Sequence, residues 1–137
     1  MSQIAPQSPH LMAARHVASL GKNIDCRNLL LEDAVLVFVD TNEAFHGPEE
    51  ICAVFDNLHA NLFSASSTVR AFHHTNHQIA IEAQFQGTHV REFAGLKPTG
   101  KTVTAEYALA YEIADGGIAA IRAYWNLDAL VRQLRGG

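Results

Sequence analysis

The chain has 137 residues, of which 48% are hydrophobic and 18% are charged, and its formal net charge is −4. This length suits one domain with its own core, and the composition excludes a disordered chain. The charges form no basic block of the kind that binds nucleic acid, and no apolar run approaches the roughly 20 residues that a membrane span needs. We expect a flexible arm at residues 1–7 and a single domain over residues 8–137.

The N-terminal segment predicts two helices. Ser8 is a suitable N-cap, Pro9 suits the first helical turn, and apolar residues then recur near helical spacing until Gly21. A second, shorter helix is expected over residues 25–31. The opening sequence MSQIAPQSPH lacks the basic start and apolar stretch of a secretory signal, so we expect a cytoplasmic protein.

The two cysteines, Cys26 and Cys52, form no Cys-x-x-Cys motif. Each lies in a segment that is expected to be helical. We therefore predict two buried free thiols rather than a disulfide.

A strand, a turn and the clearest helix follow. Residues 34–39 (AVLVFV) are rich in β-forming side chains, and residues 40–42 (DTN) are typical of a turn. Gly47 and Pro48 open a helix in which apolar residues recur at i, i+3, i+4, i+7 and i+11. These residues are Ile51, Val54, Phe55, Leu58 and Leu62.

Beyond residue 67 the apolar residues alternate with polar ones, which predicts strands. The pattern predicts a hairpin over residues 68–74 and 77–87. It predicts a second antiparallel pair over residues 101–113 and 118–125. A terminal helix is expected behind an N-cap at Asn126. The order of elements predicts an α+β fold with helices on one face of a mostly antiparallel sheet.

Three segments in this order resemble a known family. They are FHGPEEICAVF at 45–55, FQGTHVREFAGLKPTGK at 85–101 and DGGIAAIRAYWNLDALVRQL at 115–134. The chain is similar, over residues 11–134, to SnoaL-like and ketosteroid isomerase-like members of the nuclear transport factor two superfamily. The resemblance implies a cone-shaped, strongly curved sheet with about three N-terminal helices on its concave face and a short C-terminal helix.

The family likeness also implies an apolar pocket and frequent homodimers through the outer sheet face. The outer face carries Gln84, Gln86, Thr102, Thr104 and Glu106, and it is either a partner surface or a solvated one. A mostly apolar inner face suits a hydrophobic small molecule. The expected substrate-binding residues are Phe38, Phe55, Ile81, Phe85, Val90, Tyr111, Ile121 and Trp125.

The chain lacks residues that better-known relatives need for their activities, so specific activities are not expected. By the resemblance, the catalytic and oxyanion-binding aspartates of ketosteroid isomerases fall on Phe38 and Leu109, and their helical tyrosine falls near Arg15 or His16. The Arg and two Asp of limonene epoxide hydrolases fall on Val90, Glu92 and Ala123. The isomerase and epoxide hydrolase residues are therefore not matched, and the SnoaL-like polyketide cyclases remain nearest, through Gly87-Thr88-His89 and Pro98-Thr99-Gly100.

Two carboxylates are candidate bases. Asp40 follows Phe38 by two residues and would share its face, although an Asp here also suits a turn cap. Glu92 would share a face with Val90, and its alternative role is a surface ion pair with Arg91 or Lys97. A carboxyl on an apolar wall has a raised pKa, which suits general-base catalysis.

Two further side chains are candidates for stabilising an oxyanion. Tyr107 is expected on the inner face, where it is either a donor to substrate or a satisfied core residue. His89 could shuttle a proton near neutral pH or serve a structural role. The histidines at 73, 74 and 77 lack an acidic or thiolate companion, so we predict no metal and no cofactor.

The sequence predicts a SnoaL-like, cofactor-free enzyme that acts by proton transfer on a hydrophobic carbonyl compound, as a cyclase or an isomerase. Asp40 or Glu92 would remove the proton, while Tyr107 or His89 stabilises the oxyanion. The alternative is a non-catalytic ligand-binding or dimerisation domain of the same fold. A cavity walled by a carboxylate favours the enzyme, and a cavity filled by Phe38, Phe55, Phe85 and Trp125 favours the alternative.

Overall fold

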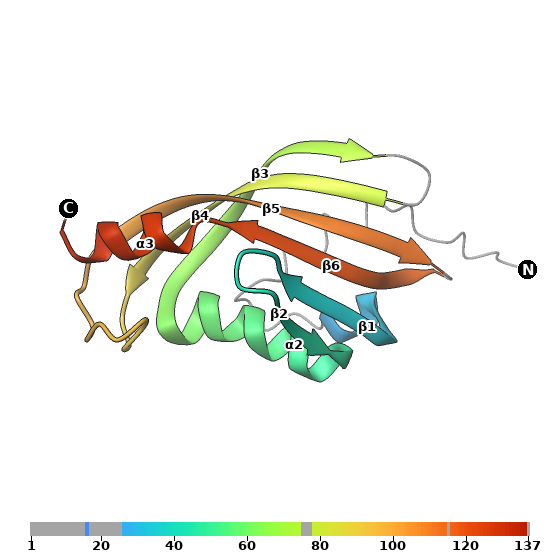
Figure 1. Cartoon of the computed structure of the whole chain (residues 1–137), viewed down its shortest axis with the longest axis horizontal. Coiled ribbons are helices and arrows are strands. Elements are labelled where there is room, and N and C mark those ends of the chain that lie inside the picture. Colours follow the sequence, from blue (N-terminus) through green and yellow to red (C-terminus); the bar gives the residue numbers. More distant parts are fainter. Residues whose placement is uncertain (1–15, 17–25, 75–77, 115, 137) are drawn as a thin grey trace, which may run out of the picture.

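The computed structural model describes residue 16 and residues 26–74, 78–114 and 116–136. Six strands form one sheet in the order β2-β1-β6-β5-β4-β3, and two α-helices accompany it (Figure 1). The elements are η1 (Cys26–Leu29), β1 (Leu30–Phe38), β2 (Glu43–His46), α2 (Gly47–Asp56), η2 (Asn57–Leu62), β3 (Phe63–His74), β4 (Gln78–His89), β5 (Thr102–Ala114), β6 (Gly117–Trp125) and α3 (Leu127–Leu134). This arrangement confirms the predicted α+β class.

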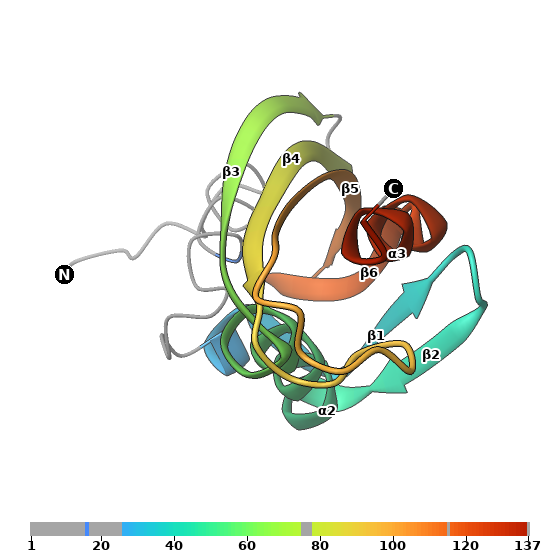
Figure 2. The same cartoon turned by 90° about the vertical axis from the view of Figure 1, so that its left-hand side faces the viewer.

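The sheet is antiparallel except between β1 and β6. The predicted alternation is confirmed in β4, where Ile79, Ile81, Ala83 and Phe85 are buried. Gly116 turns the chain between β5 and β6 with a φ of 78°, a conformation that favours glycine. Figure 2 shows β3, β4 and β5 following curved paths across the molecule.

Both α-helices cover the inner face of the sheet. Helix α2 buries Ile51 and Phe55 against residues of β1, β4, β5 and β6 in one core cluster. Helix α3 buries Leu130 and Leu134 against Phe63 and other residues of a second cluster. Partly buried Tyr107 and Trp125 contact both clusters, so these two side chains lie where the two cores meet.

One expectation about the helices is wrong, and another lies mostly outside the described residues. Residues 25–31 form only the single turn η1 before β1 begins at Leu30, because Leu30 pairs with Ile118 of the parallel strand β6. Of the about three N-terminal helices expected, the described residues show one complete α-helix, α2. The helix expected at 8–20 lies outside the described residues apart from His16, which is helical.

The segment before and the segment after α2 also differ from expectation. The turn after β1 is followed by a short strand, β2, which pairs with β1 and was not predicted. The last six residues of the predicted helix, Asn57–Leu62, form a π-helix. π-Helical segments are rare in proteins, and those that occur often lie at functional sites.

The expectation of two buried free thiols is wrong, because Cys52 is disulfide-bonded. The chain has two cysteines in all, and Cys52 is only 5% exposed. Reducing compartments usually keep thiols reduced. The cytoplasmic location stays a prediction.

Within the described ranges, no helix is long and apolar enough to cross a membrane.

The C-terminal helix α3 is fixed to the sheet by a side-chain amide. The Asn126 side chain accepts a hydrogen bond from the Ala129 amide at 3.0 Å, which confirms the predicted N-cap. The Gln133 side chain then pairs with the backbone of Thr104: it accepts from the Thr104 N–H at 3.1 Å and donates to the Thr104 carbonyl at 2.9 Å. Gln133 thus occupies hydrogen-bonding groups of β5 beyond the last paired residue of β6.

We predict that Gln133→Ala lowers the free energy of unfolding by about 1 kcal/mol, the usual net contribution of such hydrogen bonds. Urea unfolding followed by circular dichroism measures this. Arg132→Gln, one residue earlier on the exposed side of α3, should change it by less than about 0.5 kcal/mol. Equal stabilities of the two variants would show that the Gln133 pairing contributes nothing.

Candidate functional site

Two neighbouring cavities lie between the inner face of the sheet and the helical layer. The inner cavity has a volume of about 30 Å³, and the outer groove has a volume of about 370 Å³. Both are lined by Phe38, Leu58 and Trp125, so these three side chains separate one from the other. The inner cavity is lined by Phe38, Phe55, Leu58, His59, Phe85, Ala105, Tyr107, Leu109, Ala123, Tyr124 and Trp125.

His59 places a titratable ring in this mostly apolar inner cavity. It belongs to the π-helical segment η2 and is 4% exposed. Its Nδ1 lies 3.1 Å from the Phe55 carbonyl oxygen, which can only accept a hydrogen bond, so Nδ1 carries the proton. Burial lowers the pKa of His59, against the raising effects of the Phe55 carbonyl and of Asp56, so the ring is neutral at pH 7.

Ser67 of β3 connects His59 with Tyr107. The His59 Nε2 lies 2.8 Å from the Ser67 hydroxyl and must accept from it, because Nδ1 holds the ring proton. Ser67 also lies close enough to Tyr107 to oppose slightly the rise in the Tyr107 pKa. The contact has no regular hydrogen-bond geometry, so the buried Tyr107 hydroxyl has no partner among the described residues.

The Tyr107 hydroxyl is a proton donor over the whole physiological pH range. Burial raises its pKa to about 12, and the neighbouring Ser67 lowers it by a smaller amount. A buried donor without a partner is costly and is usually explained by an unseen water or by function. The hydroxyl lines an apolar cavity, so it can donate to an acceptor atom that enters there.

Sequence reasoning missed His59 and Ser67. His59 follows Phe55 by four residues and therefore lies on the same face of a helix as a predicted core residue. Ser67 lies opposite Phe85 in the β3–β4 register, on the inner face. The four-residue spacing from Phe55 could have identified His59. Ser67 was missed because β3 was expected to begin only at residue 68.

The structure places part of the predicted substrate-binding set around the inner cavity. Phe38, Phe55, Phe85 and Trp125 line it, as does the candidate catalytic residue Tyr107. Three others, Ile81, Tyr111 and Ile121, are fully buried in the core and line neither cavity. Tyr111 instead places its hydroxyl 2.7 Å from the His16 Nδ1.

The expected inward position of Asp40 is wrong. Strand β1 ends at Phe38, and Asp40 lies exposed in the turn that leads to β2. The Asn42 amide donates to the Phe38 carbonyl at 2.7 Å, and Asn42 has a φ of 60°. The alternation that would have placed Asp40 beside Phe38 stops at this turn, so its carboxyl lines neither cavity.

The expected inward positions of Val90 and Glu92 are wrong for the same reason. Strand β4 ends at His89, and the amides of Val90 and Arg91 both donate to the Leu62 carbonyl instead of to a strand. Val90 is 44% exposed and Glu92 is exposed. Phe93 turns inward instead and packs against Phe63, with 5.2 Å between the ring centroids.

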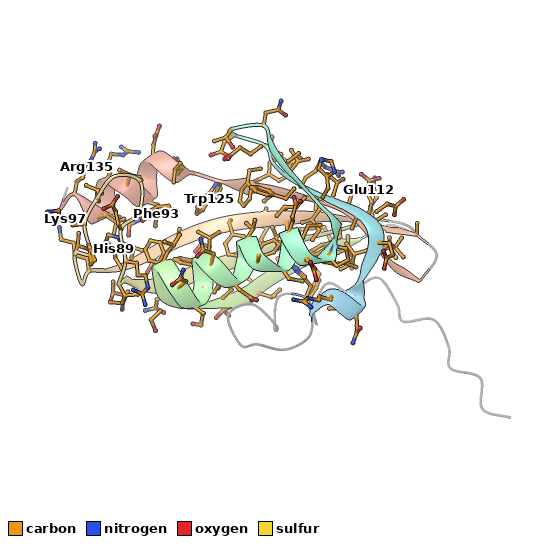
Figure 3. The ribbon with its side chains drawn as sticks, turned by 90° about the horizontal axis from the view of Figure 1, so that it is seen from below. His89, Phe93, Lys97, Glu112, Trp125 and Arg135 are labelled. Carbon is orange, nitrogen blue, oxygen red and sulfur yellow. The ribbon has the colours of Figure 1, made fainter. Side chains whose placement is uncertain are left out.

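His89 is buried and fixes the loop between β4 and β5. Its Nδ1 accepts from the Thr99 amide at 3.1 Å and lies 3.0 Å from the Thr99 hydroxyl. The two short motifs of the sequence, Gly87-Thr88-His89 and Pro98-Thr99-Gly100, therefore contact each other. His89 lines neither cavity, and Figure 3 shows it at the end of the molecule that carries Lys97, with Trp125 nearer the middle.

The described residues contain no group of three His, Cys, Asp or Glu side chains that could hold a metal ion. His73 lies beside Glu82, with 2.6 Å between the His73 Nε2 and the carboxylate, and both side chains are exposed. His74 follows at the end of β3, and His77 lies outside the described residues.

We predict that acid destabilises the fold through two buried histidines. Burial, and to a lesser extent the neighbouring His59, lowers the pKa of His16 to about 3, and burial also lowers that of His59. The unfolded chain binds these protons near pH 6.5 and the folded chain does not, so stability falls as the pH drops below 6.5. The expected slope is about 1.4 kcal/mol per pH unit for His16, and His59 adds to it down to its own lowered pKa.

Urea unfolding at pH 7, 6 and 5 measures this slope. His59→Gln removes one of the two groups and should reduce the loss of stability over this range. If the variant and the parent lose stability equally between pH 6 and pH 5, His59 is not held neutral by the fold.

Proteins of known structure that share this fold are described with different functions. IdmH of Streptomyces antibioticus, a candidate polyketide cyclase, is 22% identical with a TM-score of 0.79, covering 93% of this chain and 99% of that one. AclR of Streptomyces galilaeus, a candidate hydroxylase, is 16% identical with a TM-score of 0.79, covering 93% and 96%. A ketosteroid isomerase-like protein of Catenulispora acidiphila is 15% identical with a TM-score of 0.76, covering 93% of each chain.

At these identities the likeness shows the fold and leaves the reaction open. No curated protein matches the chain. The family assignment comes from the sequence pattern itself, because the model of the SnoaL-like polyketide cyclase family matches residues 11–134. The chain therefore belongs to the SnoaL-like polyketide cyclase family, within the ketosteroid isomerase-like group of folds.

Proposed function

We propose that this chain is an enzyme that transfers a proton on a hydrophobic carbonyl compound, as a cyclase or an isomerase of its family would. The observation that carries the proposal is the Tyr107 hydroxyl: buried, protonated and without a partner among the described residues, at the wall of an apolar cavity. Such a donor stabilises the negative charge that develops on a carbonyl oxygen when a proton leaves the neighbouring carbon.

The sizes of the two cavities indicate how a ligand would bind. The inner cavity, at about 30 Å³, holds roughly one or two atoms, whereas ligand sites usually measure about 300–1,000 Å³. The outer groove, at about 370 Å³, lies within that range. The carbonyl oxygen would therefore enter the inner cavity between Phe38, Leu58 and Trp125, while the apolar body of the ligand lies in the groove.

A second candidate function is ligand binding without catalysis. It is favoured by the absence of any carboxylate from the inner cavity and by the presence there of Phe38, Phe55, Phe85 and Trp125. The two functions share the same donor and the same pocket. They differ in whether a bound carbonyl compound exchanges the hydrogens on the carbon next to its carbonyl group.

We expect the chain to bind the apolar ketone 2-tetralone and to catalyse exchange of its α-hydrogens in D₂O, measured by proton NMR. Trp125 is the only tryptophan and lies between the two cavities, so its fluorescence should report binding. Tyr107→Phe should weaken binding by about tenfold, the loss of one hydrogen bond of about 1.4 kcal/mol, and should slow exchange further.

The matched control is Tyr111→Phe, because Tyr111 lies on the same face of β5 but lines neither cavity. It should leave affinity and exchange within about twofold of the parent. Binding of 2-tetralone without exchange would support the non-catalytic function. Equal affinity in the parent and Tyr107→Phe would remove the basis of both proposals.

We also propose a homodimer through the outer sheet face. Its centre carries two alanines of β5: Ala110 lies between Ala80 and Arg122, and Ala108 lies between Glu82 and Tyr124, which is 43% exposed. Small side chains let a second sheet approach closely. Arg70–Glu106, His73–Glu82 and Arg122–Glu112 ion pairs surround this centre.

The proposed dimer predicts a change in mass on mutation. Ala110→Glu should place a like charge at the centre of a two-fold contact and convert dimer to monomer in sedimentation experiments. A monomeric parent at micromolar concentration would contradict the proposal.

A further inference from the structure

The Ser67 side chain contacts His59 and Tyr107, two polar residues of the inner cavity. Its hydroxyl lies 2.8 Å from the His59 Nε2 and beside the Tyr107 hydroxyl. It projects from β3, next to Phe85 of β4 in the register, so it reaches this position from the sheet while His59 reaches it from the helical layer. A serine, a histidine and a tyrosine from three separate elements therefore meet at one point.

The direction of these hydrogen bonds is fixed by the Phe55 carbonyl. Because this oxygen takes the Nδ1 proton of His59, the Nε2 lone pair faces Ser67 and draws the hydroxyl proton toward the ring. The oxygen of Ser67 is left with lone pairs and no proton of its own to give to a ligand. This is the arrangement of a hydroxyl activated by a histidine that a third group orients.

We propose that Ser67 and His59 act together as the general base of the proton transfer, with Tyr107 holding the carbonyl oxygen. The inference rests on the proposed function and supplies the base that Asp40 and Glu92 do not provide. A carbonyl oxygen bonded to Tyr107 has its α-carbon two bonds farther on, and the Ser67 side chain lies beside the Tyr107 hydroxyl.

The step balances without a further reactant. The proton on the α-carbon passes to the Ser67 oxygen while the Ser67 proton passes to the His59 Nε2. The electron pair of the broken C–H bond forms the enolate, whose oxygen accepts from Tyr107. Reversal of the relay returns a proton to the same carbon or to another carbon of the enolate, and His59 becomes neutral again.

The groups around His59 allow it to alternate between the two charge states. Burial disfavours the imidazolium, while the Phe55 carbonyl and Asp56, on the preceding turn, favour it. The neighbouring His16 is neutral in this range, because its own pKa is lowered to about 3. Tyr107 faces the site from β5, with Tyr111 four residues farther along the same strand. The balance of these groups keeps the base neutral in the resting protein and able to accept one proton.

The decisive measurement is α-hydrogen exchange of 2-tetralone in D₂O by four variants at saturating ketone. Ser67→Ala and His59→Gln should each slow exchange by about 100-fold, the lower end of general-base effects, with little change in the affinity read from Trp125 fluorescence. Ser67→Thr keeps the hydroxyl and should restore most of the rate. Ser66→Ala, at the neighbouring exposed position, should match the parent.

The pH dependence separates the base from a merely structural role. Exchange by the parent should fall as the pH drops through the lowered pKa of His59, below 6.5, and the residual rate of His59→Gln should lose this dependence. If Ser67→Ala and His59→Gln exchange at the parental rate while Tyr107→Phe is slow, the base lies elsewhere and this inference is overturned. If the parent itself gives no exchange, the proposed enzymatic function fails first.

Discussion

The pairing of β4 with β5 is the constraint on which the site depends. The two strands match residue by residue from Gln78 opposite Glu112 to Thr88 opposite Thr102. Because side chains alternate between faces, a slip of one residue would turn Tyr107 to the outer face and bring Glu106 into the core. Ile79, Ile81 and Leu109, all almost fully buried, make such a slip costly. The apolar core therefore fixes the position of the Tyr107 hydroxyl at the wall of the inner cavity.

The second requirement is a neutral histidine inside an apolar wall. His59 is held by a backbone carbonyl on one side and by Ser67 on the other, and aromatic Phe85 packs edge-on at 5.2 Å between ring centroids. Burial alone would only lower its basicity. The oriented hydrogen bonds give the ring a single tautomer, and this makes it useful as a proton acceptor. The π-helical segment that carries it is thus the part of the helical layer most closely tied to the proposed chemistry.

The sequence predicted the fold class, the central strands and the apolar inner face, because alternation over ten or more residues leaves few other readings. It failed where strands end. Asp40 and Glu92 were placed inward by extending the alternation past Phe38 and His89, and the backbone hydrogen bonds that end these strands are long-range or turn-specific. The disulfide at Cys52 and the meeting of His59 with Ser67 depend on contacts between elements, which spacing along the chain does not encode. His89 illustrates a third case, in which a candidate donor is used to close a loop through Thr99.

The amide of Gln133 has a consequence for the solubility of the chain. Beyond Tyr107, the side of β5 that faces β6 has no further strand to pair with, since Trp125 is the last partner. A strand edge with free N–H and C=O groups is a template for pairing with other chains. Helix α3 covers the apolar residues beneath it and places the Gln133 side-chain amide on the Thr104 backbone. At this one residue the amide makes the hydrogen bonds that a neighbouring strand would make. A chain shortened within α3 would expose this edge and aggregate by strand addition, even though every residue of the cavity would still be present.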